Sequence, residues 1–93
     1  MLTEENKFTD IKELKDFTRM CMRNFDRPML LAFYAEWNPE SVELRDNIKA
    51  NFEEEQIDCA FGFVDTDRQE NHEIVSNLKA VALPYIILID SQK

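Results

Sequence analysis

The chain contains 93 residues, enough for one small domain but not for two. Its 19 Asp and Glu residues outnumber its 11 Lys and Arg residues, and the net charge of -8 argues against nucleic acid or an anionic membrane as the main partner. Apolar residues make up 44% of the chain, which is enough for a core and argues against disorder. The single glycine excludes Gly-rich phosphate loops, which need several glycines at fixed spacing.

Helical and strand-like patterns alternate along the first half of the chain. Apolar residues recur every three or four positions over 10–25, which predicts a helix, and Asp10 with Glu13 fits a capping pair at its start. The continuous apolar run 29–34 predicts a strand buried on both faces. The spaced apolar positions over 39–55 then predict a second helix.

The second half of the chain continues this alternation. The apolar run 57–64 predicts a second strand, and the only glycine, Gly62, lies inside it, where it admits close packing. Residues 71–79 predict a third, shorter helix, and the apolar run 85–89 predicts a third buried strand. The order of these segments predicts an α/β fold in which helices cover a mostly parallel sheet.

Four features of the chain occur in the order and at the spacing of a known family. They are the apolar strand 29–34, Ala35-Glu36-Trp37, the acidic turn Val64-Asp65-Thr66-Asp67, and Leu83-Pro84-Tyr85. With these features the sequence resembles the thioredoxin family over nearly its whole length. The resemblance implies a thioredoxin-like fold, a central mixed sheet with flanking helices, in a single domain over 1–93. It also implies a cis peptide bond before Pro84.

The C-terminal end of the chain differs from the family pattern. Thioredoxin domains usually continue with another strand and a final helix, whereas this sequence stops at Lys93. The resemblance therefore implies a fold that lacks the usual final strand and helix, with strand 85–89 at an exposed sheet edge. Because an exposed apolar edge pairs readily with another chain, we expect either a fragment of a longer protein or a homodimer formed through 85–89.

The redox motif of the family is replaced. Thioredoxins carry Cys-x-x-Cys directly after the tryptophan, and here the four residues are Asn38-Pro39-Glu40-Ser41. An amide and a hydroxyl supply neither the thiolate nucleophile nor the resolving thiol of disulfide exchange. The resemblance also places Ala32 where redox-active members have a buried acid, and Phe63 where they often have its charged neighbour. We therefore expect a redox-inactive member with no catalytic residue and no dithiol reductase activity.

The replaced motif also has a purely structural interpretation. Asn is favoured at the N-cap of a helix, Pro at the first helical position, and Glu beside the positive helix end, so 38–41 is a good helix start. The alternative is a site at which the helix N-terminus receives a carboxylate or another anion. Glu40 would oppose such a ligand.

A peptide-binding groove is the functional feature that the resemblance retains. In the thioredoxin fold, the tryptophan and the residue before the cis-proline border a shallow apolar groove whose backbone pairs with extended peptides. A large aromatic at a strand end is also typical of a core residue, so Trp37 has two interpretations. The candidate binding residues are Trp37, Asn38, Pro39, Ser41, Leu83, Pro84 and Tyr85.

The cysteines and the histidine fit no known reactive motif. Cys21 lies on the apolar face of the first predicted helix and Cys59 within the predicted strand 57–64, so both are interpreted as core thiols. The only histidine, His72, has no second ligand at short spacing, so neither a metal site nor a cofactor is predicted. Ser41, His72 and an acid could be imagined as a triad, but nothing in the sequence places them together.

These observations predict a non-catalytic thioredoxin-like module that binds or scaffolds other proteins. The expected partner is a protein or peptide, not nucleic acid or membrane, and the polar N-terminus and sparse cysteines indicate a cytoplasmic location. The alternative function is an atypical thiol-redox or glutathione-linked protein that acts through a single cysteine. A regulatory or structural domain within a larger assembly is a third interpretation.

Overall fold

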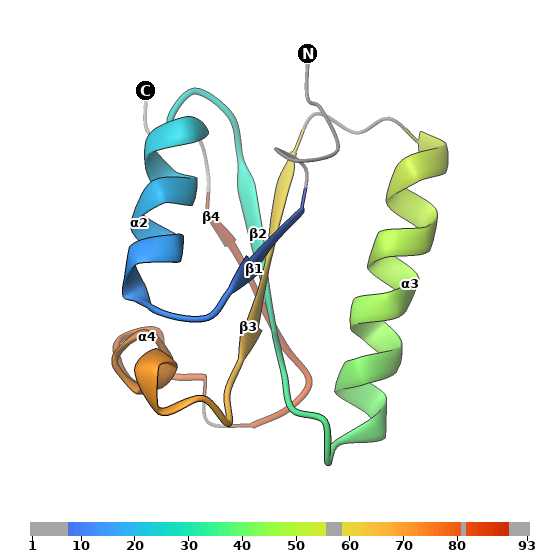
Figure 1. Cartoon of the computed structure of the whole chain (residues 1–93). Helices are drawn as coiled ribbons and strands as arrows, with labels where there is room; N and C mark the ends of the chain where they lie inside the picture. Colours follow the sequence, from blue (N-terminus) through green and yellow to red (C-terminus); the bar gives the residue numbers. More distant parts are fainter. Residues whose placement is uncertain (1–7, 56–58, 81, 90–93) are drawn as a thin grey trace.

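A four-stranded mixed sheet forms the centre of the molecule. The computed structural model describes residues 8–55, 59–80 and 82–89. The strands lie in the order β1 (Phe8–Ile11), β3 (Ala60–Asp65), β2 (Met29–Tyr34) and β4 (Tyr85–Ile89). The first three run parallel and β4 runs antiparallel to β2 (Figure 1).

Helices cover both faces of this sheet. On one face lie α2 (Leu14–Arg23) and α4 (His72–Asn77), which follows the short 3₁₀ helix η1 (Gln69–Asn71); α3 (Pro39–Glu55) lies on the other (Figure 1). Each face has its own buried cluster, because successive side chains of a strand point to opposite sides. The apolar run of β2 illustrates this, since Leu31 and Phe33 enter the first cluster and Ala32 enters the second.

Several predicted elements are confirmed. The strand 29–34 and the helix 39–55 have the bounds that their apolar patterns predicted. The second strand is described from Ala60 to Asp65, and positions 57 and 58 of the prediction lie outside the described residues. The third predicted helix, 71–79, starts in the last residue of η1 and continues as α4, and it ends before Lys79, which has a positive φ of 57°.

The prediction of a helix from residue 10 is wrong. Phe8–Ile11 is a strand, β1, paired in parallel with β3, and α2 begins only at Leu14. The proposed capping pair is therefore also wrong: Glu13 occupies the N-cap position without a side-chain cap bond, and the Lys12 N–H donates to Asp16 Oδ2 at 3.0 Å. This segment is a strand despite the helical spacing of its apolar residues, because Ile11 is buried in the first cluster and pairs with Val64 of β3.

The strand β4 is less buried than its apolar sequence suggested. Tyr85, Ile87 and Ile89 are half-buried against the first cluster, whereas Ile86 and Leu88 are exposed on the other face. Among the described residues β4 pairs only with β2, so its outer edge faces no described strand. The homodimer through 85–89 stays a prediction. None of the helices in the described ranges is long and apolar enough to cross a membrane.

The only glycine of the chain lies where β3 passes closest to the core beneath α2. A Cβ atom at Gly62 would lie 2.7 Å from Leu31 Cδ2, 2.8 Å from Met20 Sδ and 2.9 Å from Ile11 Cδ1. All three side chains are fully buried, so none can move away without displacing the neighbours packed against it. Gly62 therefore allows α2 and β1 to pack tightly on the sheet.

We predict that Gly62→Ala lowers the free energy of unfolding by about 1–3 kcal/mol, because the added methyl overpacks the core. Urea unfolding followed by circular dichroism measures this. Ile11→Val removes one of the three obstructing atoms, so the double variant should lose less stability than the two single changes together. An unchanged unfolding midpoint for Gly62→Ala would contradict the predicted packing.

Candidate functional site

The predicted binding residues meet at one end of the sheet. β2 and β3 end together, since Tyr34 pairs with Asp65, and β4 begins beside them, since Phe33 pairs with Tyr85. The turn 35–38 leaves β2 at this end and leads into α3, while Leu83 and Pro84 lead into β4. The sheet register therefore brings the two predicted halves of the site, 37–41 and 83–85, to the same edge.

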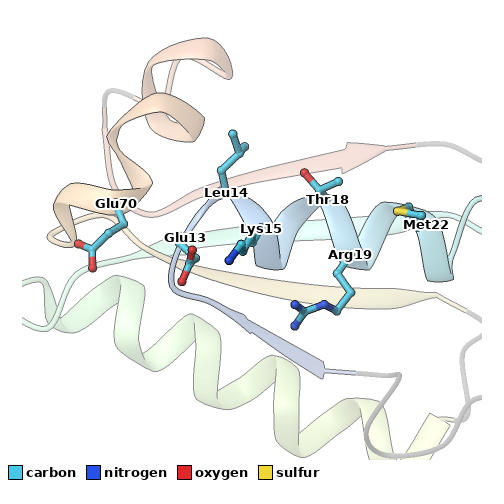
Figure 2. Close-up of a pocket in the computed structure, with 7 residues that line it drawn as sticks. All are labelled: Glu13, Leu14, Lys15, Thr18, Arg19, Met22 and Glu70. Carbon is cyan, nitrogen blue, oxygen red and sulfur yellow. The ribbon is translucent and has the colours of Figure 1, made fainter.

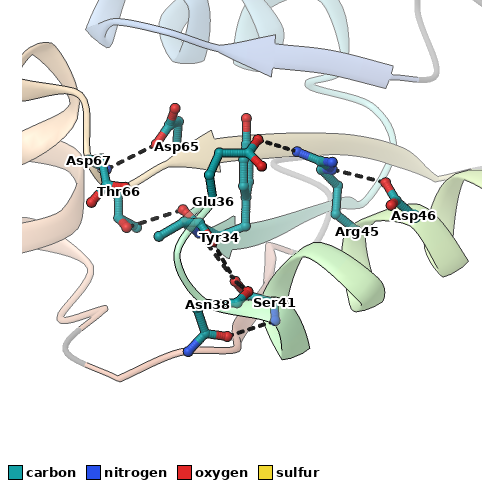
Figure 3. Close-up of polar contacts among 10 residues, drawn as sticks. Tyr34, Glu36, Asn38, Ser41, Arg45, Asp46, Asp65, Thr66 and Asp67 are labelled. Carbon is teal, nitrogen blue, oxygen red and sulfur yellow. Dashed lines mark hydrogen bonds and ion pairs between the residues drawn. The ribbon is translucent and has the colours of Figure 1, made fainter.

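Asn38 and Ser41 complete the start of α3 (Figure 3). The Ser41 N–H donates to Asn38 Oδ1 at 2.8 Å, which is the geometry of an N-cap. The Ser41 hydroxyl donates to the Asn38 carbonyl at 2.8 Å and accepts from the Ala35 N–H at 3.2 Å, and Ser41 is only 2% exposed. Both side chains thus satisfy the backbone of the turn, as the structural interpretation of the motif proposed.

Trp37 is not a core residue. It is 68% exposed, and its indole N–H donates to Asp67 Oδ1 at 2.8 Å. Asp67 lies in the turn after β3, which is itself tied down: the Thr66 N–H donates to the Tyr34 carbonyl at 2.9 Å and the Asp67 N–H to Asp65 Oδ1 at 3.0 Å. The indole is therefore an exposed apolar surface held in one orientation.

The second half of the site combines exposed and inward-facing residues. The Leu83–Pro84 peptide bond is cis, and Pro84 is exposed while Leu83 is half-buried against the first cluster. Tyr85 points inward: its ring lies 5.7 Å from that of Phe33, and its hydroxyl donates to the Leu78 carbonyl at 3.4 Å. Tyr85 and Ser41 therefore support the site from beneath, and Trp37, Pro39 and Pro84 are its exposed residues.

The two strand positions beneath the site hold no ionisable side chain. Ala32 and Phe63 are register partners in β2 and β3, and both are buried in the cluster on the α3 face. The Lys49 ammonium of α3 lies 5.0 Å from the centre of the Phe63 ring. Because an alanine and a phenylalanine can neither donate nor accept a proton, these positions provide only packing.

An ion-pair network that sequence reasoning missed joins α3 to the turn. Arg45 stacks on Tyr34, with its guanidinium carbon 4.6 Å from the ring centre, and pairs with Glu36 at 3.3 Å and Asp46 at 3.1 Å (Figure 3). Burial, and next the nearby charge of Asp65, raise the pKa of Tyr34, so its hydroxyl stays protonated at neutral pH. No local pattern in the sequence predicts these contacts, because they depend on how α3 crosses the sheet.

The remaining reactive residue types lie apart from the site. Cys59 is buried beside β3 and Cys21 is half-buried against the first cluster. Ser41 makes its hydrogen bonds with Ala35 and Asn38, and none joins it to His72, which is exposed on α4. In the described ranges, no three His, Cys, Asp or Glu side chains are arranged so that they could hold a metal ion.

Comparison with solved structures identifies the architecture. A thioredoxin from Fasciola hepatica is 21% identical, with a TM-score of 0.78 over 91% of this chain and 79% of that chain. The short form of spinach chloroplast thioredoxin f is 19% identical, with a TM-score of 0.80 over 100% of this chain and 80% of that chain. This chain has a thioredoxin fold.

A reduced thioredoxin from Schistosoma mansoni gives the same result, with 20% identity and a TM-score of 0.78 over 94% of this chain and 79% of that chain. No protein-family model matches the sequence. No curated protein matches it either. The thioredoxin fold, with helices flanking a central mixed sheet, is thus confirmed by architecture and not by close sequence relatives.

We predict that Ser41→Ala lowers the free energy of unfolding by about 1–3 kcal/mol, since the buried Ala35 N–H loses its acceptor. Asn38→Ala should cost about 1 kcal/mol through loss of the N-cap, whereas Asn38→Asp, which keeps the acceptor, should be close to neutral. Urea unfolding of the three variants measures the difference. Equal stability of Ser41→Ala and the unaltered protein would show that the hydroxyl does not support the turn.

Proposed function

We propose that this protein is a non-catalytic thioredoxin-fold module that binds a segment of another protein at the surface around Trp37 and the Leu83–Pro84 turn. The observation that carries the proposal is the exposed indole of Trp37, fixed by Asp67, beside two positions at which Asn38 and Ser41 hold the backbone and carry no thiol. The proposed surface thus lacks the groups for disulfide exchange.

The partner segment is proposed to be extended and basic. A hollow of about 440 Å³ lies on α3 beside this surface, lined by Pro39 and Val42 together with the carboxylates of Glu36, Glu43 and Asp46. Exposed acidic side chains thus surround a partly apolar surface. A segment that carries Lys or Arg beside an apolar residue complements it, and a cation can also stack on an exposed indole.

Main-chain groups at the same end of the sheet as the indole favour an extended partner. Within the described ranges, the N–H and C=O groups of Leu83 make no hydrogen bond with another residue. A peptide in extended conformation could use them in the manner of an added strand. Main-chain pairing would give affinity and the acidic, partly apolar surroundings would give specificity.

The alternative is a thiol-redox or glutathione-linked activity that uses a single cysteine. Burial of Cys59 and the packing of Cys21 against the core favour the binding function, since reactive thiols lie in accessible, electropositive surroundings. The sequence contains only two cysteines, too few for a disulfide framework, and we therefore propose a reducing compartment such as the cytoplasm for the protein.

We predict that the protein does not reduce insulin disulfides in the presence of dithiothreitol beyond the uncatalysed rate. Both thiols should react slowly with Ellman's reagent in the folded state and quickly in urea. The matched control is Asn38→Cys/Ser41→Cys, which places the missing pair on the same fold and should gain measurable turnover. Turnover by the unaltered protein that disappears in Cys21→Ser or Cys59→Ser would establish the alternative function.

We predict that Trp37→Ala weakens peptide binding at this surface by about tenfold or more. The probe is a set of peptides enriched from a random phage-displayed library on the unaltered protein, and binding is followed through the fluorescence of Trp37, the only tryptophan, or by calorimetry for the alanine variant. We expect the enriched peptides to be basic and their affinity to fall with added salt.

Two variants of Asp67 distinguish the effect of its charge from the effect of its hydrogen bond on the orientation of the Trp37 indole. Asp67→Asn keeps an acceptor for the indole N–H but loses the charge, so it should weaken mainly the salt-dependent part of binding. Asp67→Ala removes the acceptor and should approach the effect of Trp37→Ala. Peptides that bind equally well to all four proteins would place the binding surface elsewhere.

A further inference from the structure

The outer side of α2 exposes large apolar side chains. Leu14 is 41% exposed and Met22 is 74% exposed, and Phe25, just beyond the end of the helix, is 56% exposed. Leu14, Thr18 and Met22 follow one another at intervals of four residues, so they lie along one side of the helix (Figure 2). The opposite side of α2 is already used, because Met20 is buried in the first cluster and Phe17 packs against it.

A broad hollow accompanies this apolar row. Its volume is about 710 Å³, and it is lined along its length by Leu14, Thr18 and Met22, with Lys15 and Arg19 beside them (Figure 2). Two carboxylates, Glu13 and Glu70, complete the lining near Leu14, so the basic side chains extend the hollow toward Met22. From Leu14 to Met22 the row extends over eight helical steps, or about 12 Å of helix, which is about two turns. Two turns provide room for two or three apolar side chains of a partner segment.

The charge of this region is opposite to that of the rest of the chain. Residues 12–27 contain five of the 11 basic residues and only three acidic ones, a net charge of +2 in a chain whose net charge is -8. Three of the basic residues, Lys15, Arg19 and Arg23, are exposed and follow one another at intervals of four along α2. Within the part of the chain that the structure describes, Arg19 is ion-paired with Asp16 at the long distance of 3.8 Å. A basic row therefore runs beside the apolar row.

We propose that the outer face of α2 is a second docking surface, which binds an acidic amphipathic helix of a partner protein. Apolar residues of that helix would lie in the hollow over Leu14 and Met22, and its Asp and Glu residues would face Lys15, Arg19 and Arg23. This pairing matches apolar to apolar surface and opposite charges at the rim, which is the usual arrangement where a helix binds in a groove.

This surface is separate from the one around Trp37. α2 and α3 lie on opposite faces of the sheet (Figure 1), and the acidic hollow beside Trp37 lies on α3. The basic row lies on α2, whereas Glu36, Glu43 and Asp46 line the hollow on α3, so the two surfaces favour partners of different charge. A chain with both surfaces can hold two different partners on one small domain.

The test begins with a phage-displayed library of random peptides of about 16 residues, long enough to form a helix on binding. The library is selected on the full chain, and enriched peptides are synthesised and measured by fluorescence anisotropy. We expect acidic sequences with Leu, Phe or Met at helical spacing. We expect Met22→Gln and the double variant Lys15→Glu/Arg19→Glu each to weaken binding by about tenfold or more, and added salt to weaken it further.

Matched variants elsewhere on the surface are the controls. Leu88→Gln changes an apolar residue that is 60% exposed on β4, and Lys49→Glu reverses one basic charge on α3. Both should leave the affinity of the acidic peptides within about twofold, and so should Trp37→Ala. Circular dichroism of each variant verifies that it is folded; because Met22 is largely exposed, Met22→Gln should unfold at the same temperature as the unaltered protein.

Several results would overturn the proposal. One is a selection without acidic amphipathic sequences, or with peptides whose affinity Met22→Gln and the charge reversal leave unchanged. Another is binding to phosphatidylcholine vesicles that contain phosphatidylserine, lost in Met22→Gln, which would make α2 a membrane surface. A dimer in sedimentation that Met22→Gln dissociates would assign the face to a second copy. Because Trp37→Ala tests the other surface, failure of either proposal leaves the other standing.

Discussion

Burial of the two central strands on both faces is the constraint on which the rest of this structure depends. β2 and β3 carry apolar side chains toward both faces of the sheet, so helices must cover each face. Parallel pairing of β1, β3 and β2 requires crossover connections, and these place α2 and α3 on opposite faces. The same connections bring the ends of β2 and β3 together, and the turn that carries Trp37 is built there.

At that turn the backbone and the side chains have separable roles. The fold needs a turn out of β2, a helix start and an acceptor for the indole N–H, and none of these needs is specific to a thiol. Asn38 and Ser41 hold the turn and the helix start with amide and hydroxyl groups, and Asp67 accepts the indole N–H. The architecture of the site can therefore persist while its chemistry changes, and this is why fold similarity alone does not assign the function.

Patterns in the sequence predicted those elements that are specified by the residues within them. The helix 39–55 and the strand 29–34 have long, uninterrupted patterns, and both have the predicted bounds. β1 was missed because it has only four residues, two of them polar, and only its pairing with β3 distinguishes it from the start of a helix. The alternating exposure of β4 likewise depends on how much of the α3 face the helix covers, which no apolar run encodes.

In the candidate site, too, contacts between neighbouring residues could be predicted and contacts between distant residues could not. Asn38 as a helix cap could be predicted because the cap lies within four residues of its partner. The bond from Trp37 to Asp67 spans 30 residues, and the ion pair between Arg45 and Glu36 depends on where α3 meets the turn. Resemblance to a known family left Trp37 with two interpretations, a groove residue or a core residue, and only the structure gave its exposure and its acceptor.

The net charge of the whole chain differs from the local charge around α2. A value of -8 describes the whole chain, yet five of its 11 basic residues lie within 12–27, so the acidic and basic residues are segregated along the sequence. Folding turns this segregation along the chain into segregation in space, because α2 and α3 lie on opposite faces of the sheet. Long-range attraction follows the total charge, but docking depends on the charges within about one Debye length, roughly 10 Å, of the contact. A partner helix over α2 therefore meets a basic, apolar surface on a protein that is acidic as a whole.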